Sequence, residues 1–164
     1  MKKKLFVLLA VIMVLSMISI PAMATPPENA EGEWIYLPTG QELLKVAGGN
    51  TFLSITEDSR WTGTFDGESK DHGTVVIYRS GRLFFKGEVE FTSVTVNGQT
   101  GTLELQVNGS KQDSGSDWVG RWVVSGGELY EAGLRGQGSW DGPGWQGDPE
   151  VEGEIHYSGN IHFE

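Results

Sequence analysis

Polar and apolar residues alternate without exception over the last 15 residues of the chain, 150–164. The even positions are all polar: Glu150, Glu152, Glu154, His156, Ser158, Asn160, His162 and Glu164. The odd positions are all apolar or glycine: Val151, Gly153, Ile155, Tyr157, Gly159, Ile161 and Phe163. A period of two places successive side chains on opposite faces of a β-strand, so this strand has one polar face. The glycines on its apolar face leave space where a flat sheet would carry bulky residues, which indicates a tightly curved sheet.

The same alternation occurs in four further segments, and glycine lies on the apolar face of each. These apolar faces consist of Leu83, Phe85, Gly87, Val89 and Phe91; Gly101, Leu103, Leu105 and Val107; Trp118, Gly120, Trp122 and Val124; and Ala132, Leu134, Gly136, Gly138 and Trp140. We expect the apolar faces to point inward and the polar faces to point to solvent.

Short turns connect these strands. Ser80-Gly81 separates two of them, and Asn97-Gly98 is a strong signal for a type I′ hairpin turn. About eight strands joined in this way predict an all-β fold, an antiparallel up-and-down closed barrel. A β-sandwich is the alternative, but closure also removes the exposed sheet edges that promote aggregation.

The apolar positions change parity within one strand. Phe91 is odd, whereas Val94 is even, so the apolar face shifts between them. An extra residue near position 92 or 93 would produce this shift, which predicts a β-bulge. With the two-residue turn after this strand, Val94 then faces Gly101 and Phe91 faces Leu103.

The first part of the domain is less regular. We expect residues 25–32 to be a disordered lead-in, because prolines and charges there cannot bury surface. A short strand is predicted over 34–37, and further strands over 51–56 and 60–65. Residues 40–47 (GQELLKVA) form the only plausible helix, about two turns long and ended by Gly48-Gly49.

Residues 1–24 have the features of a secretory signal peptide. Lys2, Lys3 and Lys4 precede an uncharged, mostly apolar run over 5–20, and Ala22-Met23-Ala24 matches a cleavage signal. We predict cleavage after Ala24 and a secreted or periplasmic location. An uncleaved membrane anchor is the alternative, but the run is shorter than the ~20 residues that a spanning helix needs. The absence of cysteine excludes a lipoprotein.

The remaining chain is long enough for one domain, which we place at 33–164. Loss of the three lysines changes the net charge from −10 to −13. Such an acidic protein should bind neither nucleic acid nor, after signal cleavage, anionic membranes. Without cysteine there are no disulfides, so packing alone must hold the fold. The oligomeric state is left open.

Several glycine-rich motifs follow one another in the middle of the chain. Residues 61–67 read WTGTFDG, residues 125–129 read SGGEL, and residues 133–140 read GLRGQGSW. This order resembles the allene oxide cyclase barrel superfamily, in particular its small prokaryotic DUF3224-like members of unknown function. The resemblance covers 61–140 and implies an eight-stranded barrel with a small apolar interior. The chain has Glu128 where the pattern has a second glycine. None of the superfamily's catalytic residues can be matched, so none is transferred.

The chain shows no recognisable catalytic constellation. It lacks cysteine and a G-x-S-x-G motif, and it has three histidines. His72 is expected in a solvated loop or at a strand start. His156 and His162 share a face, but about 20 Å separates residues six apart along a strand, too far for one metal ion. Carboxylate pairs such as Glu152 and Glu154 can cleave glycosides, but here they belong to the polar face. We therefore expect no catalytic residues, no metal and no cofactor.

Two further polar motifs have unremarkable interpretations. Residues 111–117 (KQDSGSD) could bind calcium, but they lack the acidic spacing and the closing glutamate of an EF-hand, so a solvated turn is expected. Asn108-Gly109-Ser110 is a glycosylation sequon, which matters only in a host that glycosylates exported proteins.

Aromatic residues are the better candidates for a site. They either fill the space that the inward glycines leave or line a pocket at the barrel mouth. The predicted ligand-binding residues are Tyr78, Phe85, Trp122, Trp140 and Tyr157. Trp145, in the loop that begins at Trp140, is a candidate for surface interaction or sugar stacking.

Three functions are compatible with this pattern. The favoured one is an exported barrel that binds a small apolar or amphipathic ligand without catalysis. The second is an isomerase or cyclase of the superfamily type, and the third is a carbohydrate-binding or surface interaction module. Catalysis ranks lower because the hydroxyls of Tyr78 and Tyr157 are the only ionisable groups expected inside. A buried Glu or His at the base of a cavity would reverse this order.

Overall fold

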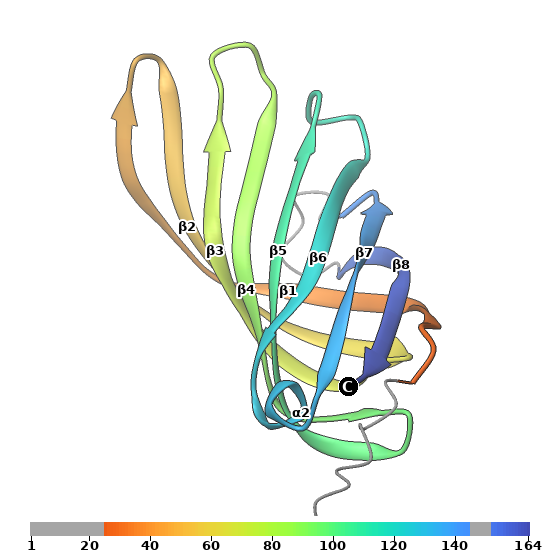
Figure 1. The fold of residues 1–164 in the computed structure, drawn as a ribbon. Helices are drawn as coiled ribbons and strands as arrows, with labels where there is room; N and C mark the ends of the chain where they lie inside the picture. The colour runs from red at the N-terminus through yellow and green to blue at the C-terminus, as the bar shows by residue number, and fades with distance from the viewer. Residues whose placement is uncertain (1–24, 145–151) are drawn as a thin grey trace, which may run out of the picture.

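The computed structural model describes residues 25–144 and 152–164, and most of them lie in β-strands (Figure 1). The predicted signal peptide, residues 1–24, lies outside the described residues. The strands are β1 (Glu28–Ala47), β2 (Asn50–Gly63), β3 (Asp66–Ile77), β4 (Leu83–Val96), β5 (Gln99–Lys111), β6 (Trp118–Gly126), β7 (Leu134–Gly142) and β8 (Gly153–Phe163). One helix of four residues, α2 (Glu128–Glu131), precedes β7.

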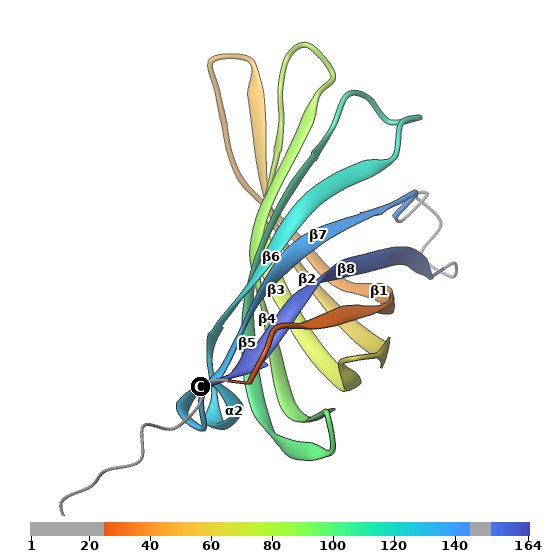
Figure 2. The same ribbon diagram turned by 45° about the vertical axis from the view of Figure 1, so that its right-hand side comes forward.

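Each strand pairs antiparallel with the next, and β8 pairs with β1, so the eight strands form a closed ring. The prediction of an all-β fold with about eight antiparallel strands is confirmed. The two ends of the ring differ: α2 and the C-terminus lie at one end, while the β1–β2, β3–β4 and β5–β6 hairpins splay outward at the other (Figure 2). We call this splayed end the mouth.

The predicted turn and bulge in β4 and β5 are confirmed. Phe91 pairs with Leu103 and Val94 pairs with Gly101, with a register shift between the two pairs. Asn97 and Gly98 have φ angles of 50° and 80°. Both values lie in the left-handed region that a type I′ turn requires.

Two predictions for the N-terminal half are wrong. Residues 40–47 are not a helix but the distal half of β1, where Leu43 pairs with Leu53 of β2. Several residues of this segment favour a helix. Pairing with β2 in the hairpin outweighs this preference, because it gives the backbone N–H and C=O groups their hydrogen-bond partners. Residues 28–32 are not disordered, because they pair with β8 and bury Ala30 to 1% exposure. Likewise, the segments 51–56 and 60–65 belong mainly to one continuous strand, β2.

Pairs of inward glycines provide the space for aromatic rings in the ring's interior. Gly109 of β5 pairs with Gly120 of β6, and a Cβ on either would lie within 2.5 Å of the Trp140 indole. The pair Gly138 and Gly159 of β7 and β8 accommodates the Trp122 indole in the same way. The expectation that inward glycines make room for large rings is therefore confirmed.

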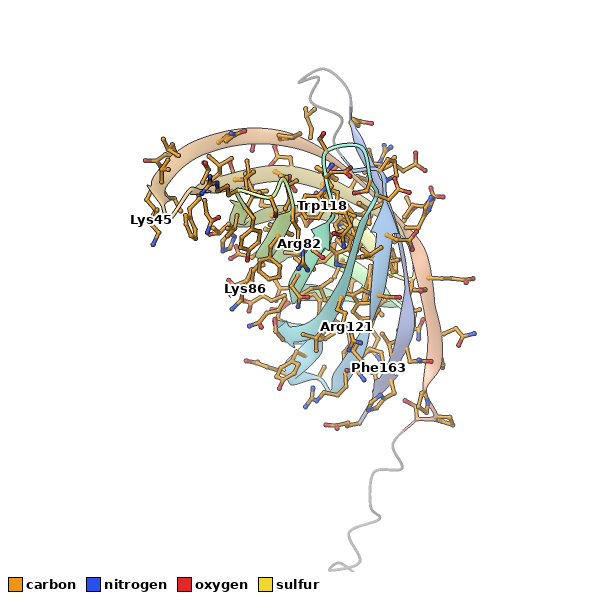
Figure 3. All side chains as sticks on the ribbon, turned by 90° about the horizontal axis from the view of Figure 1, so that it is seen from above. Lys45, Arg82, Lys86, Trp118, Arg121 and Phe163 are labelled. Carbon is orange, nitrogen blue, oxygen red and sulfur yellow. The ribbon has the colours of Figure 1, made fainter. Side chains whose placement is uncertain are left out.

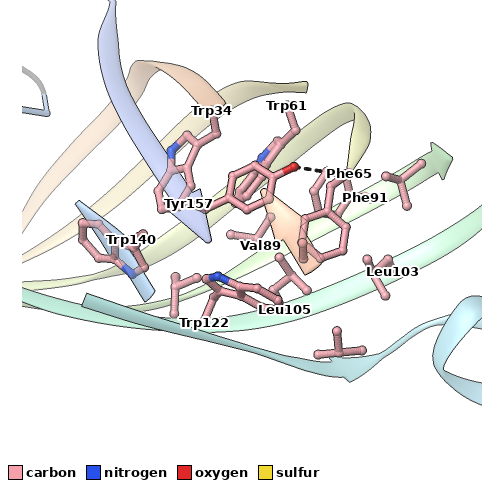
Figure 4. Close-up of a cluster of buried hydrophobic side chains, with 14 of the residues drawn as sticks. Trp34, Trp61, Phe65, Val89, Phe91, Leu103, Leu105, Trp122, Trp140 and Tyr157 are labelled. Atoms are coloured by element: carbon pink, nitrogen blue, oxygen red, sulfur yellow. Dashed lines mark hydrogen bonds between the residues drawn. The ribbon is translucent and has the colours of Figure 1, made fainter. Parts of the chain in front are cut away.

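These rings and others fill the middle of the molecule (Figure 4). Trp34 stacks on Trp61 with ring centroids 4.4 Å apart, and Trp61 contacts Phe91 edge-on. The rings of Phe65 and Trp122 meet at 5.4 Å. Space for a ligand must therefore be sought above this aromatic cluster, toward the mouth.

Candidate functional site

A cavity of about 50 Å³ lies between the aromatic cluster and the mouth. Its walls come from seven of the eight strands and consist of Trp34, Tyr36, Ile55, Glu57, Val75, Phe85, Trp118, Trp140 and Ile155. Figure 3 looks into the ring from the mouth, with Trp118 among the central side chains and Lys45 at the far tip of the β1–β2 hairpin. A volume of this size accommodates a few water molecules or the end of a small ligand.

Glu57 is the one carboxyl group in this wall, and it faces Asp71. The two residues are direct partners in the β2–β3 pairing, on the inner face of the ring. Burial, and secondarily the charge of Asp71, raise the pKa of Glu57 to about 8. At neutral pH Glu57 therefore keeps its proton, and an otherwise aromatic and aliphatic cavity contains a carboxylic acid.

Asp71 is more deeply buried than Glu57, but its carboxylate accepts hydrogen bonds from two hydroxyl groups. Ser59 and Ser69 donate hydrogen bonds to its two carboxylate oxygens at 2.5 and 2.6 Å. Trp61 in turn donates to the Ser69 hydroxyl at 3.0 Å. Burial raises the pKa of Asp71 to about 6, while the two serine hydrogen bonds oppose the shift. Between pH 6 and 8 the pair therefore consists of an ionised Asp71 and a protonated Glu57.

The indole N–H of Trp34 is a second polar group in the cavity wall. The side chain is 4% exposed, and its Nε1 has no hydrogen-bond partner among the described residues. The buried indoles of Trp61, Trp122 and Trp140, in contrast, each donate a hydrogen bond. The Trp34 ring lies beside Trp140, another wall of the cavity, with their ring centroids 5.4 Å apart (Figure 4). A buried donor without a partner is costly, so the Trp34 Nε1 marks a place for an acceptor.

The structure divides the predicted ligand-binding residues into three groups. Phe85 and Trp140 line the cavity, as expected for a site near the mouth. Trp122 and Tyr157 belong to the aromatic cluster that fills the interior, and neither lines the cavity. Tyr78 follows the end of β3, is 38% exposed and does not line the cavity.

Tyr157 has a structural role that its position in the alternation did not reveal. Its hydroxyl donates to the Thr62 carbonyl and accepts from the Phe65 N–H, both at 2.9 Å (Figure 4). Burial raises the pKa of Tyr157 to about 12, so the hydroxyl stays protonated. It therefore connects β8 to the β2–β3 turn.

The sequence interpretation missed Glu57 because it interrupted a strand between 56 and 60, and it missed Asp71 because it expected a loop or a strand start at His72, whereas β3 already begins at Asp66. The alternation of inward and outward positions along β2 did indicate that Glu57 faces inward. Ile55, Glu57, Ser59 and Trp61 are all odd positions of β2, and their alternation continues unbroken through the carboxyl group. A continuous strand over this segment would have placed Glu57 inside.

His72 and His156 lie on the outside, each close to two exposed carboxyl groups. His72 is near Glu88 and Glu90, at 3.3 and 3.8 Å, and His156 is near Glu33 and Glu154, at 3.5 and 3.6 Å. All six side chains are about half exposed. The expected solvent-facing position of His156 is confirmed.

The 111–117 segment is a turn organised by its own side chains. The carboxylate of Asp113 accepts hydrogen bonds from the N–H groups of Gly115 and Ser116, both at 2.9 Å. At its start Lys111 is buried, with its ammonium 5.4 Å from the Trp118 ring. The other proposed surface residue, Trp145, lies outside the described residues.

No protein-family model matches the chain, and no curated protein matches its sequence. The resemblance to the allene oxide cyclase barrel superfamily therefore remains a prediction. Within residues 25–144 and 152–164, no helix is long and apolar enough to cross a membrane.

Proposed function

We propose that this protein is an exported β-barrel that binds a small amphipathic ligand in the cavity at its mouth. The observation that supports this function is the cavity itself, which joins five aromatic residues to a single carboxylic acid. Ligand sites commonly have this composition, a mainly apolar wall with a few polar groups that fix orientation. Barrel mouths are also a usual location for them.

The volume of the cavity limits how the ligand is bound. Because the rings below it fill the interior, only one end of a ligand enters the 50 Å³ space. The remainder would lie along the splayed mouth, where Leu53, Ile77 and Leu83 pack against the core and remain partly exposed. The ligand should therefore have a small polar end and an apolar body.

A fluorescent neutral amphiphile, N-phenyl-1-naphthylamine, tests this function. We expect its emission to increase on binding to the protein. Val75→Phe should abolish that increase, because Val75 is a wall residue and the larger ring would occupy the cavity. Val119→Phe is the matched control, since Val119 is 58% exposed on the outer face. The proposal fails if the wild-type protein does not bind the dye or if both variants bind it as the wild type does.

A second function, proton-transfer catalysis of the isomerase or cyclase type, is favoured by Glu57. The low rank of catalysis depended on an interior without carboxyl groups, and Glu57 and Asp71 both face inward. Catalysis stays the second candidate because Glu57 is a partly exposed residue of the cavity wall and not a fully buried group. A carboxyl group with a pKa of about 8 can act as a general acid at neutral pH and as a base above it.

The smallest substrate for this chemistry is a simple ketone. Exchange of the α-hydrogens of cyclopentanone for deuterium can be followed by NMR. Catalysis predicts exchange faster than the buffer background in the wild type and at the background rate in Glu57→Gln. Equal rates in the two proteins would leave ligand binding as the function.

A further inference from the structure

Two residues of the cavity wall, Trp34 and Glu57, carry hydrogen-bond donors with free capacity. One is the Trp34 indole N–H, which has no partner among the described residues although its side chain is almost completely buried. The other is the carboxyl group of Glu57, for which the described part of the chain likewise provides no hydrogen-bond partner. The neighbouring Asp71 differs, because Ser59 and Ser69 already donate to both of its oxygens.

The charges around the cavity argue against an anionic ligand. Asp71, directly across from Glu57 on β3, is ionised at neutral pH and would repel a carboxylate or phosphate. The outward Asp58 and His72 flank the pair, and Lys111 lies at the mouth beside Trp118. A cation would meet the positive end of the Trp34 N–H dipole. A neutral acceptor atom suits both free donors.

We propose that the cavity recognises a neutral ligand through one oxygen, a carbonyl or an ether, that accepts hydrogen bonds from the Trp34 N–H and the Glu57 carboxyl group. The apolar body of this ligand then packs against Phe85 and Trp118. The inference rests on the proposed binding of a ligand in this cavity and specifies the chemical class of that ligand.

A pair of ligands with the same shape tests the role of the oxygen. Acetophenone and α-methylstyrene differ by the replacement of a carbonyl oxygen with a methylene group. We expect acetophenone to bind about five- to tenfold more tightly at pH 7, measured by quenching of tryptophan fluorescence and by NMR line broadening. A hydrogen bond to a buried donor that is otherwise unpaired gives a preference on the order of tenfold.

Variants of the two donors should remove this preference. In Trp34→Phe and in Glu57→Leu the ratio of the two Kd values should fall toward one. Glu57→Gln should retain most of the preference, because an amide also donates a hydrogen bond. Glu42→Leu is the control, since Glu42 is exposed near the tip of the β1–β2 hairpin and lies outside the cavity wall. Cooperative thermal unfolding of each variant confirms that the fold is retained.

The outcomes distinguish this inference from the proposed function. Equal binding of acetophenone and α-methylstyrene would overturn the inference and leave the proposed function intact. Binding of neither compound, nor of the naphthylamine dye, would overturn both. Tighter binding of benzyltrimethylammonium than of acetophenone would also overturn the inference, because the cavity would then select a cation.

Discussion

Glu57 and Asp71 lie directly opposite each other on β2 and β3, with both carboxyl groups inside the ring of strands. The serines that hold Asp71 favour its ionised form, whereas Glu57 has no such support. At neutral pH the pair therefore keeps one proton. Glu57, the residue that lines the cavity, holds this proton. The stability of the protein and the proposed ligand binding would thus depend on the same carboxyl group.

The first prediction concerns the pH dependence of stability. The pKa of Glu57 rises from 4.5 to about 8 on folding, so the folded state holds a proton that the unfolded state has lost between these values. Its contribution to stability is therefore lost as pH rises from 4.5 to 8. Glu57→Gln should be more stable than the wild type at pH 8.5 by about 2 to 4 kcal/mol, since one pKa unit corresponds to about 1.4 kcal/mol. Urea unfolding measures this difference.

Near pH 4 the advantage of Glu57→Gln should disappear, because the wild-type carboxyl group is then protonated in both states. Glu90→Gln provides the control, since Glu90 is exposed on the outer face and its removal should have little effect. A constant difference between Glu57→Gln and the wild type at all pH values would contradict the assigned pKa.

The second prediction concerns the coupling of the two carboxyl groups. Removal of the charge in Asp71→Asn should lower the pKa of Glu57, because that charge is the second cause of its shift. The pKa should remain above 4.5, since burial is the larger cause and is unchanged. Titration of the Glu57 side-chain carbon by NMR measures both values, and an unaltered pKa would show that the groups are independent.

The third prediction assigns Tyr157 to the fold and not to the ligand. Tyr157→Phe removes a hydroxyl that joins the Thr62 carbonyl to the Phe65 N–H. The two backbone groups lose this partner, which should cost about 1 to 3 kcal/mol of unfolding free energy. Dye binding should be unchanged, because Tyr157 does not line the cavity. Tyr78→Phe, at an exposed position, should alter neither quantity.

The fourth prediction concerns the glycine pairs. Gly120→Ala would place a Cβ 2.2 Å from the Trp140 indole and 2.2 Å from the Asn108 carbonyl, so the ring or the strand must move. We expect a loss of about 1 to 3 kcal/mol, together with weaker dye binding because Trp140 is a cavity wall. Gly115→Ala is the control, since its Cβ would meet no atom closer than 3.6 Å. Stability equal to that of the control would show that the ring can shift freely.

The regular strands could be predicted because their alternation reports directly which face is buried. The parity change between Phe91 and Val94 was sufficient to place the bulge and both residue pairs beside it. Residues 40–47 failed because local propensity favours a helix, while their conformation is decided by pairing with β2 across the hairpin. Such a tertiary effect leaves little trace in the segment itself.

The site was harder to predict than the fold because its polar groups interrupt the apolar pattern. Phe85 and Trp140 were identified by their place on an apolar face, and both line the cavity. Glu57 was missed because a charged residue in an alternating run resembles a turn. The free donor of Trp34 could not be found in any sequence pattern, since it depends on which atoms surround the indole in three dimensions.

The glycine pairs also constrain how this sequence can change over time. A larger residue at Gly120 requires both a smaller ring at Trp140 and a shift of the strand that carries Asn108, and Gly138 and Gly159 are limited in the same way by Trp122 and by the facing backbone. The two glycines of a pair and the indole that they accommodate should therefore be substituted together, although the three residues are far apart in the sequence. Related sequences should exchange them together, so that an alanine at position 120 accompanies the loss of the indole at position 140.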